Sequence, residues 1–181
     1  MVAKTNPGNV HIWRNRFRRC AGKARAHNAR HRCKRGARSV PARATVKRQA
    51  INAHQRQVLT RGLRVARKKR ASRNVMVSYV AAATQESTAT NLRGGHGTSV
   101  GHLQLIDIHE PSGTNGVSWR MNIENSARWY LRQAVQIDRR RSVRPGRLAQ
   151  KVQRSAHPHA YNQWESEARR TVRLFLGPCG V

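Results

Sequence analysis

The chain has 181 residues and a formal net charge of +30. This length allows one domain of ordinary size with an extension and argues against two full domains. The chain has three cysteines, an odd number without the spacing typical of paired disulfides, which argues against a small domain held together by disulfides. No apolar run approaches the roughly 18 residues of a membrane span. The first residues also lack the apolar core of a signal peptide.

Positive charge is concentrated in the first part of the chain. Residues 1–73 hold 23 of the 37 Lys and Arg residues and no acidic residue, whereas all seven acidic residues come later. We therefore expect residues 1–56 to form a basic extension, with residues 1–42 flexible because they contain few aliphatic side chains. Its expected targets are an anionic wall polymer, nucleic acid or virion proteins, and such binding would weaken as salt rises.

Two features of this extension suggest other kinds of binding. Trp13 and Phe17 lie beside the RNRFRR run and could stack on bases, so a nucleic-acid-binding protein is the alternative functional class. The extension also contains four potential zinc ligands: Cys20, His27, His31 and Cys33. Their spacing fits no common zinc finger and cations surround them, so we expect neither a metal nor a cofactor.

Helical patterns begin at Ala44. Apolar residues recur near helical spacing as far as Lys69, which predicts a helix with one interruption. Ser72 or Asn74 can cap the next segment, VMVSYVAAATQES, which is apolar nearly all round and is therefore expected to be a buried helix. The NLRGGHGTSVG run predicts a glycine-rich loop, and VGHLQLIDI predicts a short strand or an extended turn.

Three further helical segments are predicted downstream. NIENSARWYLRQAVQID is amphipathic and is broken at Arg144-Pro145-Gly146, and GRLAQKVQRS and AYNQWESEARRTVRLFL follow. The expected fold class is therefore mainly α, with a helical domain over residues 57–175 and one irregular glycine-rich region in its middle.

Five histidines in the loops are expected to be solvated or to lie at the edge of a cleft: His96, His102, His109, His157 and His159.

Glu86 is the first acidic residue of the chain, and it lies at the end of the apolar helix. Its carboxyl group would lie near the hydrophobic core, beside a loop open enough to admit a ligand. Burial raises the pKa of a carboxyl group, and a glutamic acid that stays protonated near neutral pH can donate a proton to a glycosidic oxygen. A buried Glu86 paired with an arginine is the alternative.

The runs AATQES, NLRGG and SVGHLQL resemble the lysozyme-like and lytic-transglycosylase superfamily of peptidoglycan hydrolases, especially the versions found in phages of actinobacteria. NIENSARWYLRQ and LAQKVQRSAHPHAYNQWESEA extend the resemblance, which covers roughly residues 58–170. It implies a lysozyme-like α+β fold with a glycine-rich cleft loop or a small sheet. It also implies that Glu86 is catalytic, and the residues expected to contact the substrate are Ser99, Gly101, Gln104 and Tyr161.

Two departures from this family bear on the reaction. His96-Gly97-Thr98-Ser99 stands where relatives often have Asp-x-Asp-Ser, and Leu103 replaces a common aromatic residue. The resemblance implies that a lytic transglycosylase uses one glutamate as acid and then as base, whereas a hydrolase needs a second carboxylate or a group that positions water. We therefore favour the transglycosylase, while Asp107 or Glu110 could supply a second carboxylate.

The other candidate site residues also have structural interpretations. Gln104 could close the loop, Ser99 could cap a turn, and Tyr161 could belong to the core. The domain as a whole could be an inactive remnant in a nucleic-acid-binding or virion structural protein. If the protein is an enzyme, the resemblance implies an endolysin or a virion component that acts on peptidoglycan. Such an enzyme would be located in the virion, or in the host cytoplasm before release to the wall.

Overall fold

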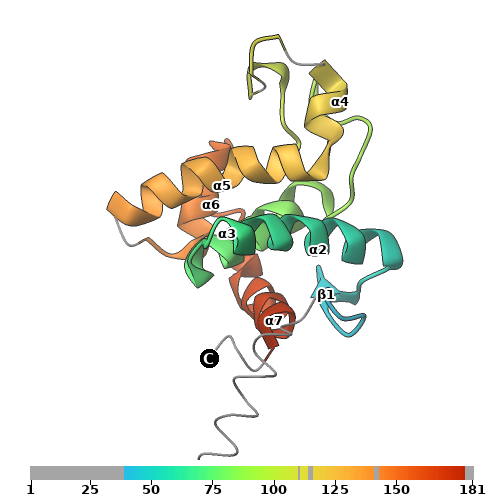
Figure 1. The fold of residues 1–181 in the computed structure, drawn as a ribbon, viewed down its shortest axis with the longest axis vertical. Coiled ribbons are helices and arrows are strands. Elements are labelled where there is room, and N and C mark those ends of the chain that lie inside the picture. The colour runs from blue at the N-terminus through green and yellow to red at the C-terminus, as the bar shows by residue number, and fades with distance from the viewer. Residues whose placement is uncertain (1–38, 110, 114–115, 141–142, 178–181) are drawn as a thin grey trace, which may run out of the picture. The chain divides into compact units, whose positions relative to one another are not determined.

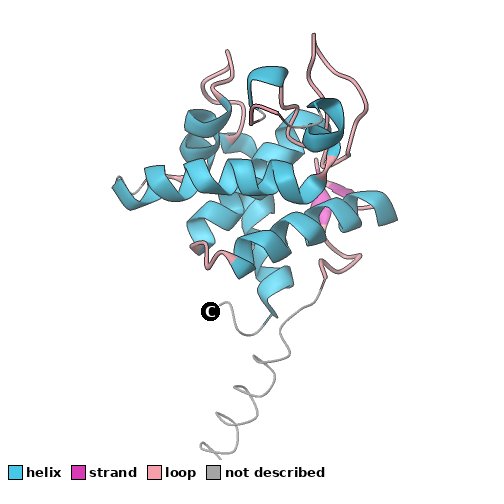
Figure 2. Ribbon diagram, turned by 45° about the horizontal axis from the view of Figure 1, so that its top comes forward, coloured by secondary structure: helices cyan, strands magenta, loops and turns pink. Residues whose placement is uncertain are grey.

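The structure is mainly helical with one two-stranded sheet, as Figures 1 and 2 show. It is a computed structural model that describes residues 39–109, 111–113, 116–140 and 143–177. The predicted mainly α class is confirmed. The helices are α2 (Ala53–Lys68), α3 (Arg73–Ser87), η1 (Asp107–His109), α4 (Gly116–Met121), α5 (Ile123–Arg140), α6 (Pro145–Gln153), η2 (Asn162–Trp164) and α7 (Glu165–Leu176), and the strands are β1 (Thr45–Val46) and β2 (Gln49–Ala50).

Helix α3 forms the centre of the folded part, as the apolar pattern predicted. Ser72 caps its first turn by accepting a hydrogen bond from the N–H of Val75, and every residue from Val75 to Thr84 is buried. Helices α5, α6 and α7 pack against α3, and α2 packs mainly against α5 (Figure 1). The end of α3 is fixed by Thr88, whose φ of 56° lies in the left-handed region.

The predicted helix over residues 44–52 is wrong, because this segment forms a hairpin. Strands β1 and β2 pair antiparallel, and the turn residues Lys47 and Arg48 have φ angles of 49° and 65°. Positive φ angles at both residues of a two-residue turn match the right-handed twist of the strands that the turn connects. The N–H of Arg48 donates to Glu167 Oε1 on α7 at 2.9 Å, which fixes the turn against the helical part.

The packed part of the chain begins earlier than the predicted boundary at residue 57. One compact unit runs over Ala37–Leu176, and the apolar side chains that join its core before α2 are those of Val40, Ala44, Val46 and Ile51. Helix α2 then begins at a capping box in which Asn52 and Gln55 bond each other's backbone N–H groups. Residues 1–38, which include most of the segment predicted to be flexible, lie outside the described part of the chain.

The three downstream helices form where the periodicity predicted them. Pro145 starts α6 as its first residue, a position where the missing N–H of proline costs nothing. The VGHLQLIDI segment is a turn followed by the short helix η1, with a single bridge between Val100 and Leu105. Among the described residues, no helix combines the length and apolar character needed to cross a membrane.

Candidate functional site

Glu86 lies in the last turn of α3 and is half-buried. The phenol of Tyr161, which precedes η2, donates a hydrogen bond to Glu86 Oε1. The side chain of Gln153, at the end of α6, lies close enough to the carboxyl group to favour its charged form. The central helix and two later segments of the chain therefore meet at one carboxyl group.

The environment of Glu86 raises its pKa. Burial is the main cause, because it penalises the charged form, and the hydrogen bond from Tyr161 and the nearby Gln153 amide act in the opposite direction. Burial and the neighbouring Glu86 carboxylate also raise the pKa of Tyr161, so the phenol remains a donor. Glu86 can therefore hold a proton at a higher pH than an exposed glutamate, and the two donors can stabilise the anion that remains after the proton leaves.

The partners of Glu86 are uncharged, which argues against the alternative that it is paired with an arginine. Within the described residues, the acidic side chains that form ion pairs are Glu124, with Arg61, and Glu165, with Arg144 and Arg169. Glu165 is buried and also accepts a hydrogen bond from the N–H of Gly146 at 3.0 Å. A chain with a net charge of +30 thus keeps a carboxyl group at Glu86 among neutral donors.

The turn formed by residues 101–104 is held beside the end of α3. The hydroxyl of Ser87 donates to the carbonyl oxygen of His102 at 2.9 Å, and Gln153 Nε2 donates to the carbonyl oxygen of Leu103 at 2.9 Å. Gln153 therefore contacts both Glu86 and this turn. It was not among the predicted site residues, although it lies in the Val-Gln-x-Ser run that carried the family resemblance.

Gly101 and Gln104 shape the turn itself. Gly101 has a φ of 82°, and a Cβ atom there would approach the carbonyl oxygen of Arg120 to 2.8 Å, so only glycine fits. Gln104 Nε2 donates to the carbonyl oxygen of Gly101 at 2.9 Å, and a Cβ atom on Gly95 would lie 1.8 Å from Gln104 Oε1. The Gln104 amide thus packs within the glycine-rich loop, in agreement with its loop-closing interpretation.

Ser99 and Asp107 lie further along the loop and do not share the partners of Glu86. The N–H of Ser99 donates to the carbonyl oxygen of His96 at 3.2 Å, which closes a turn. Asp107 is exposed, and its Oδ1 accepts from the Thr98 hydroxyl at 3.3 Å and from the N–H of Ile108 at 3.0 Å. Glu110, the other predicted second carboxylate, lies outside the described residues.

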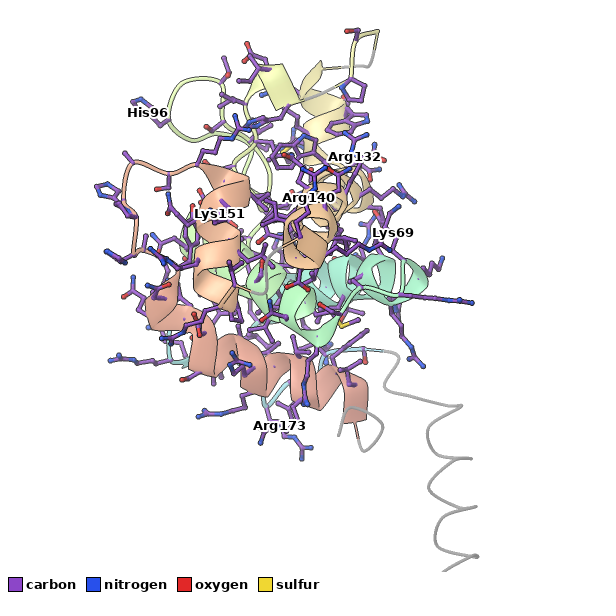
Figure 3. All side chains as sticks on the ribbon, turned by 90° about the vertical axis from the view of Figure 1, so that its left-hand side faces the viewer. Lys69, His96, Arg132, Arg140, Lys151 and Arg173 are labelled. Carbon is purple, nitrogen blue, oxygen red and sulfur yellow. The ribbon has the colours of Figure 1, made fainter. Side chains whose placement is uncertain are left out.

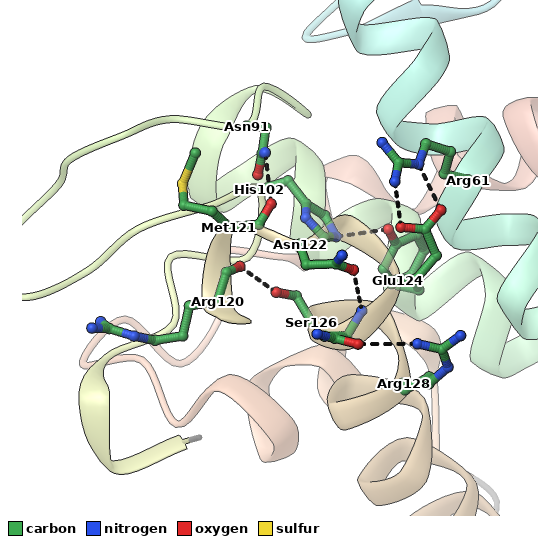
Figure 4. A network of polar contacts seen from close by, with 11 residues as sticks. Arg61, Asn91, His102, Arg120, Met121, Asn122, Glu124, Ser126 and Arg128 are labelled. Carbon is green, nitrogen blue, oxygen red and sulfur yellow. Dashed lines mark hydrogen bonds and ion pairs between the residues drawn. The ribbon is translucent and has the colours of Figure 1, made fainter. Parts of the chain in front are cut away.

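Arg120 supports this loop from α4. Its side chain is buried, and Nη1 donates to the carbonyl oxygens of Thr98 and Leu105. The backbone carbonyl of Arg120 accepts from the Ser126 hydroxyl on α5, as Figure 4 shows. Arg120 was not among the predicted site residues, because an arginine in an arginine-rich chain carries no distinguishing signal.

His102 is buried, which contradicts the expectation that it is solvated or at the edge of a cleft. Its Nε2 lies 2.7 Å from the hydroxyl of Tyr79 on α3, and burial lowers its pKa to about 3. The Tyr79 hydroxyl in turn occupies the space that a Cβ atom on Gly62 would need. His102 is therefore a neutral side chain that links the turn to α3 and α2.

The described residues contain no group of three or more His, Cys, Asp or Glu side chains that could hold a metal ion. The possible zinc ligands Cys20, His27, His31 and Cys33 lie outside this part of the chain. Comparison of the chain with models of known protein families and with curated proteins gives no match. A functional assignment therefore rests on the residues around Glu86.

Proposed function

We propose that this protein cleaves the glycan strands of peptidoglycan, with Glu86 as the catalytic acid of a lysozyme-like domain. The observation that carries the proposal is the half-buried Glu86 carboxyl group, which has a raised pKa, accepts a hydrogen bond from the uncharged Tyr161 and lies close to the Gln153 amide. General acids in glycoside cleavage need a fixed carboxyl group with a raised pKa, and Glu86 combines the two.

The convergence of separate motifs gives further support. Ser87 and residues 101–104 belong to two of the runs that resemble the peptidoglycan hydrolases, and Gln153 and Tyr161 belong to a third. Hydrogen bonds connect all three around the end of α3. The side chain of Ser155, from the same third run, also lies close to Tyr161. If the resemblance of these runs to the family were accidental, we would not expect their residues to meet around one carboxyl group.

The proposed reaction begins when Glu86 transfers its proton to the glycosidic oxygen between N-acetylmuramic acid and N-acetylglucosamine. The bond from the muramyl C1 to that oxygen breaks, and the N-acetylglucosamine side leaves with a hydroxyl group. The Glu86 carboxylate, stabilised by Tyr161 and Gln153, then accepts the proton of the muramyl 6-hydroxyl as that oxygen bonds to C1. The products are a 1,6-anhydromuramyl end and a protonated Glu86, ready for another cycle.

This lytic transglycosylase route is favoured over hydrolysis, because it needs one carboxyl group. The hydrolytic route would need a second group, and Asp107 is exposed and hydrogen-bonded to Thr98 and Ile108. Gln104 and backbone groups of the glycine-rich loop would position the sugar next to Glu86. The buried Tyr161 would act by positioning the Glu86 carboxyl group.

The setting we infer is that of a phage-type wall hydrolase. The basic segment before the folded part would act as an extension that binds an anionic wall polymer, nucleic acid or a virion protein. The enzyme would reside in the virion or in the host cytoplasm before it reaches the wall.

The test is mass spectrometry of the soluble products released from purified peptidoglycan by the wild type, Glu86→Gln and Glu124→Gln. We expect 1,6-anhydromuramyl products from the wild type and from Glu124→Gln, and none from Glu86→Gln. Hydrated reducing ends would instead indicate a hydrolase with a second carboxylate. The same products from Glu86→Gln would contradict the role of Glu86, and no products from any form would favour a nucleic-acid-binding or virion structural protein with an inactive domain.

A further inference from the structure

The exposed face of α2 is hollowed by two adjoining cavities of about 380 Å³ and 630 Å³. We call them together the α2 groove. The residues that line it come from α2, the start of α5 and the chain on either side of α2: Ser39, Ala53, Arg56, Gln57, Thr60, Arg61, Arg64, Val65, Lys68, Lys69, Glu124 and Arg128. Glu86 lines neither cavity, so the α2 groove is a second feature of the folded part.

The lining residues of α2 follow one stripe of the helix. From Ala53 to Lys68, each lining residue has another lining residue three or four positions away, which is the spacing of neighbours on one helical face. The cations from Arg56 to Lys68 extend over about 18 Å of helix axis at 1.5 Å per residue. The opposite face holds this stripe in place, because Leu59, Leu63 and Ala66 are buried in the core.

Positive charge dominates the α2 groove. Six cations line it against one carboxylate, Glu124. That carboxylate already accepts two hydrogen bonds of 2.6 Å from Arg61. Of the remaining cations, Arg56, Lys68 and Arg128 have exposed side chains. Like charges three and four residues apart disfavour the helix that carries them, so an anionic ligand would relieve a repulsion that the protein otherwise bears.

We propose that the α2 groove binds the phosphate backbone of double-stranded nucleic acid, without reading its sequence. Arginine and lysine side chains at regular intervals on a fixed helix suit a stiff polymer with regularly spaced phosphates. A flexible polyanion would have to lose more conformational freedom to follow the same stripe. No aromatic side chain is among the described residues that line the groove, so it offers no stacking platform for the bases of a single strand.

This site is independent of the catalytic proposal and of the basic extension. Its cations belong to the folded part of the chain, and among them only Arg56 falls within residues 1–56, which were predicted to form the extension. The inference therefore assigns nucleic-acid binding to a defined surface rather than to net charge. Because net charge alone produces some binding to DNA, the test must compare variants of equal charge.

The first test measures binding of the full chain to a short DNA duplex by fluorescence anisotropy over a series of salt concentrations. The groove variant is Arg56→Gln/Lys68→Gln/Arg128→Gln. The matched control is Arg132→Gln/Arg170→Gln/Arg173→Gln, which removes three exposed cations that do not line the groove. Both variants change the formal net charge from +30 by the same amount. Thermal melting of both variants checks that the fold is retained.

We expect the groove variant to bind at least about tenfold more weakly than the control near physiological salt. Loss of three phosphate contacts should also reduce the slope of log K against log salt by about 2.7. Equal weakening by the two variants would overturn the site and leave net charge as the explanation. Binding of Glu86→Gln should match the wild type, so a failure here is distinguishable from a failure of the catalytic proposal.

The second test locates the contact through lysine acetylation followed by mass spectrometry, with and without the duplex. Lys69 lies at the end of α2 and Lys151 lies on α6, well apart in Figure 3. We expect the duplex to protect Lys68 and Lys69 but not Lys151. Equal labelling of these lysines would overturn the proposal. Protection by poly(glycerol phosphate) but not by duplex at the same phosphate concentration would overturn the assignment to nucleic acid.

Discussion

Glu86 and Glu124 are two glutamates in the same strongly cationic chain, and the structure gives them opposite environments. Glu124, at the start of α5, accepts two hydrogen bonds of 2.6 Å from the guanidinium of Arg61, and this contact lowers its pKa. Glu86, at the end of α3, contacts uncharged donors, and burial raises its pKa. One carboxyl group is thus fixed as an anion, and the other is favoured to keep a proton.

The difference shows why abundant arginine does not neutralise every acid in this protein. Arg61 reaches Glu124 because α2 packs against α5, where both side chains are partly exposed. The end of α3 is surrounded instead by α6, the residues before η2 and the turn at 101–104. The packing of the helices, rather than the overall charge, determines which glutamate meets a cation.

The largest expected effect separates the two glutamates by activity. Glu86→Gln should lower peptidoglycan cleavage by about 10²- to 10⁴-fold, because it removes the group that would protonate the glycosidic oxygen. Glu124→Gln should leave cleavage within about threefold of wild type, because the change would remove an ion pair of modest strength remote from the proton transfer. Release of soluble fragments from labelled peptidoglycan measures both variants. Equal losses in the two would remove the functional distinction between them.

A smaller effect is expected for Tyr161→Phe. This change removes the donor to Glu86 Oε1, and a hydrogen bond to a charged group is worth about 1.5–3 kcal/mol, so cleavage should fall about 10- to 100-fold. The pKa of Glu86 should rise further, because the lost hydrogen bond favoured the carboxylate. The alkaline limb of the pH–rate profile should therefore move to higher pH. A drop in rate with an unchanged profile would show that Tyr161 has only a packing role.

The next expected effect concerns the stability that Glu124 provides. Glu124→Gln should lower the free energy of unfolding by about 1 kcal/mol, since the Arg61 contact is only partly buried. For a chain of this size, that is a decrease of about 2–4 °C in melting temperature. The double variant with Arg61→Gln should be little worse than either single variant. Fully additive losses in this cycle would contradict a direct interaction between the two side chains.

The smallest expected effect is a difference in how stability depends on pH. The pKa of Glu86 is raised in the folded state, so its folding penalty is absent below the unfolded pKa and grows as pH rises toward the folded value. Glu86→Gln should therefore gain stability relative to wild type as pH rises above the unfolded value of about 4.3. Glu124 has a lowered pKa, so the stability lost in Glu124→Gln should grow as pH rises from this lowered value to the unfolded value of about 4.3, and should stay constant above it. Melting curves at several pH values should thus diverge in opposite directions, and parallel curves would contradict the comparison.

Much of the helical framework could be predicted from the sequence. The apolar stretch of α3, its Ser72 cap and the amphipathic α5 follow from periodicity and capping chemistry, which are local properties. The hairpin at Thr45–Val46 and Gln49–Ala50 could not be predicted this way, because its turn is Lys47-Arg48 rather than a typical Asn-Gly pair. It is held by packing and by the contact of Arg48 with Glu167, which lies far along the chain.

The candidate site was predictable only in part, because some of its features are local in the sequence and others depend on tertiary packing. Glu86 stood out because it is the first carboxylate after a long cationic segment and follows an apolar helix. Its partners Gln153 and Tyr161 become neighbours only when α6 and the residues before η2 pack against α3. The burial of Arg120 and His102 likewise depends on tertiary packing. No local pattern in the sequence distinguishes Arg120 from the other arginines or His102 from the other histidines.

The proposed catalysis depends most on the proton that Glu86 holds. With only seven acidic side chains, the protein is suited to a titration in which each carboxyl carbon is followed individually by NMR. We predict that Glu86 titrates above the ordinary glutamate value of 4.5 and that Glu124 titrates below it. A Glu86 carboxyl group that titrates at or below the pKa of Glu124 would contradict its assignment as the catalytic acid.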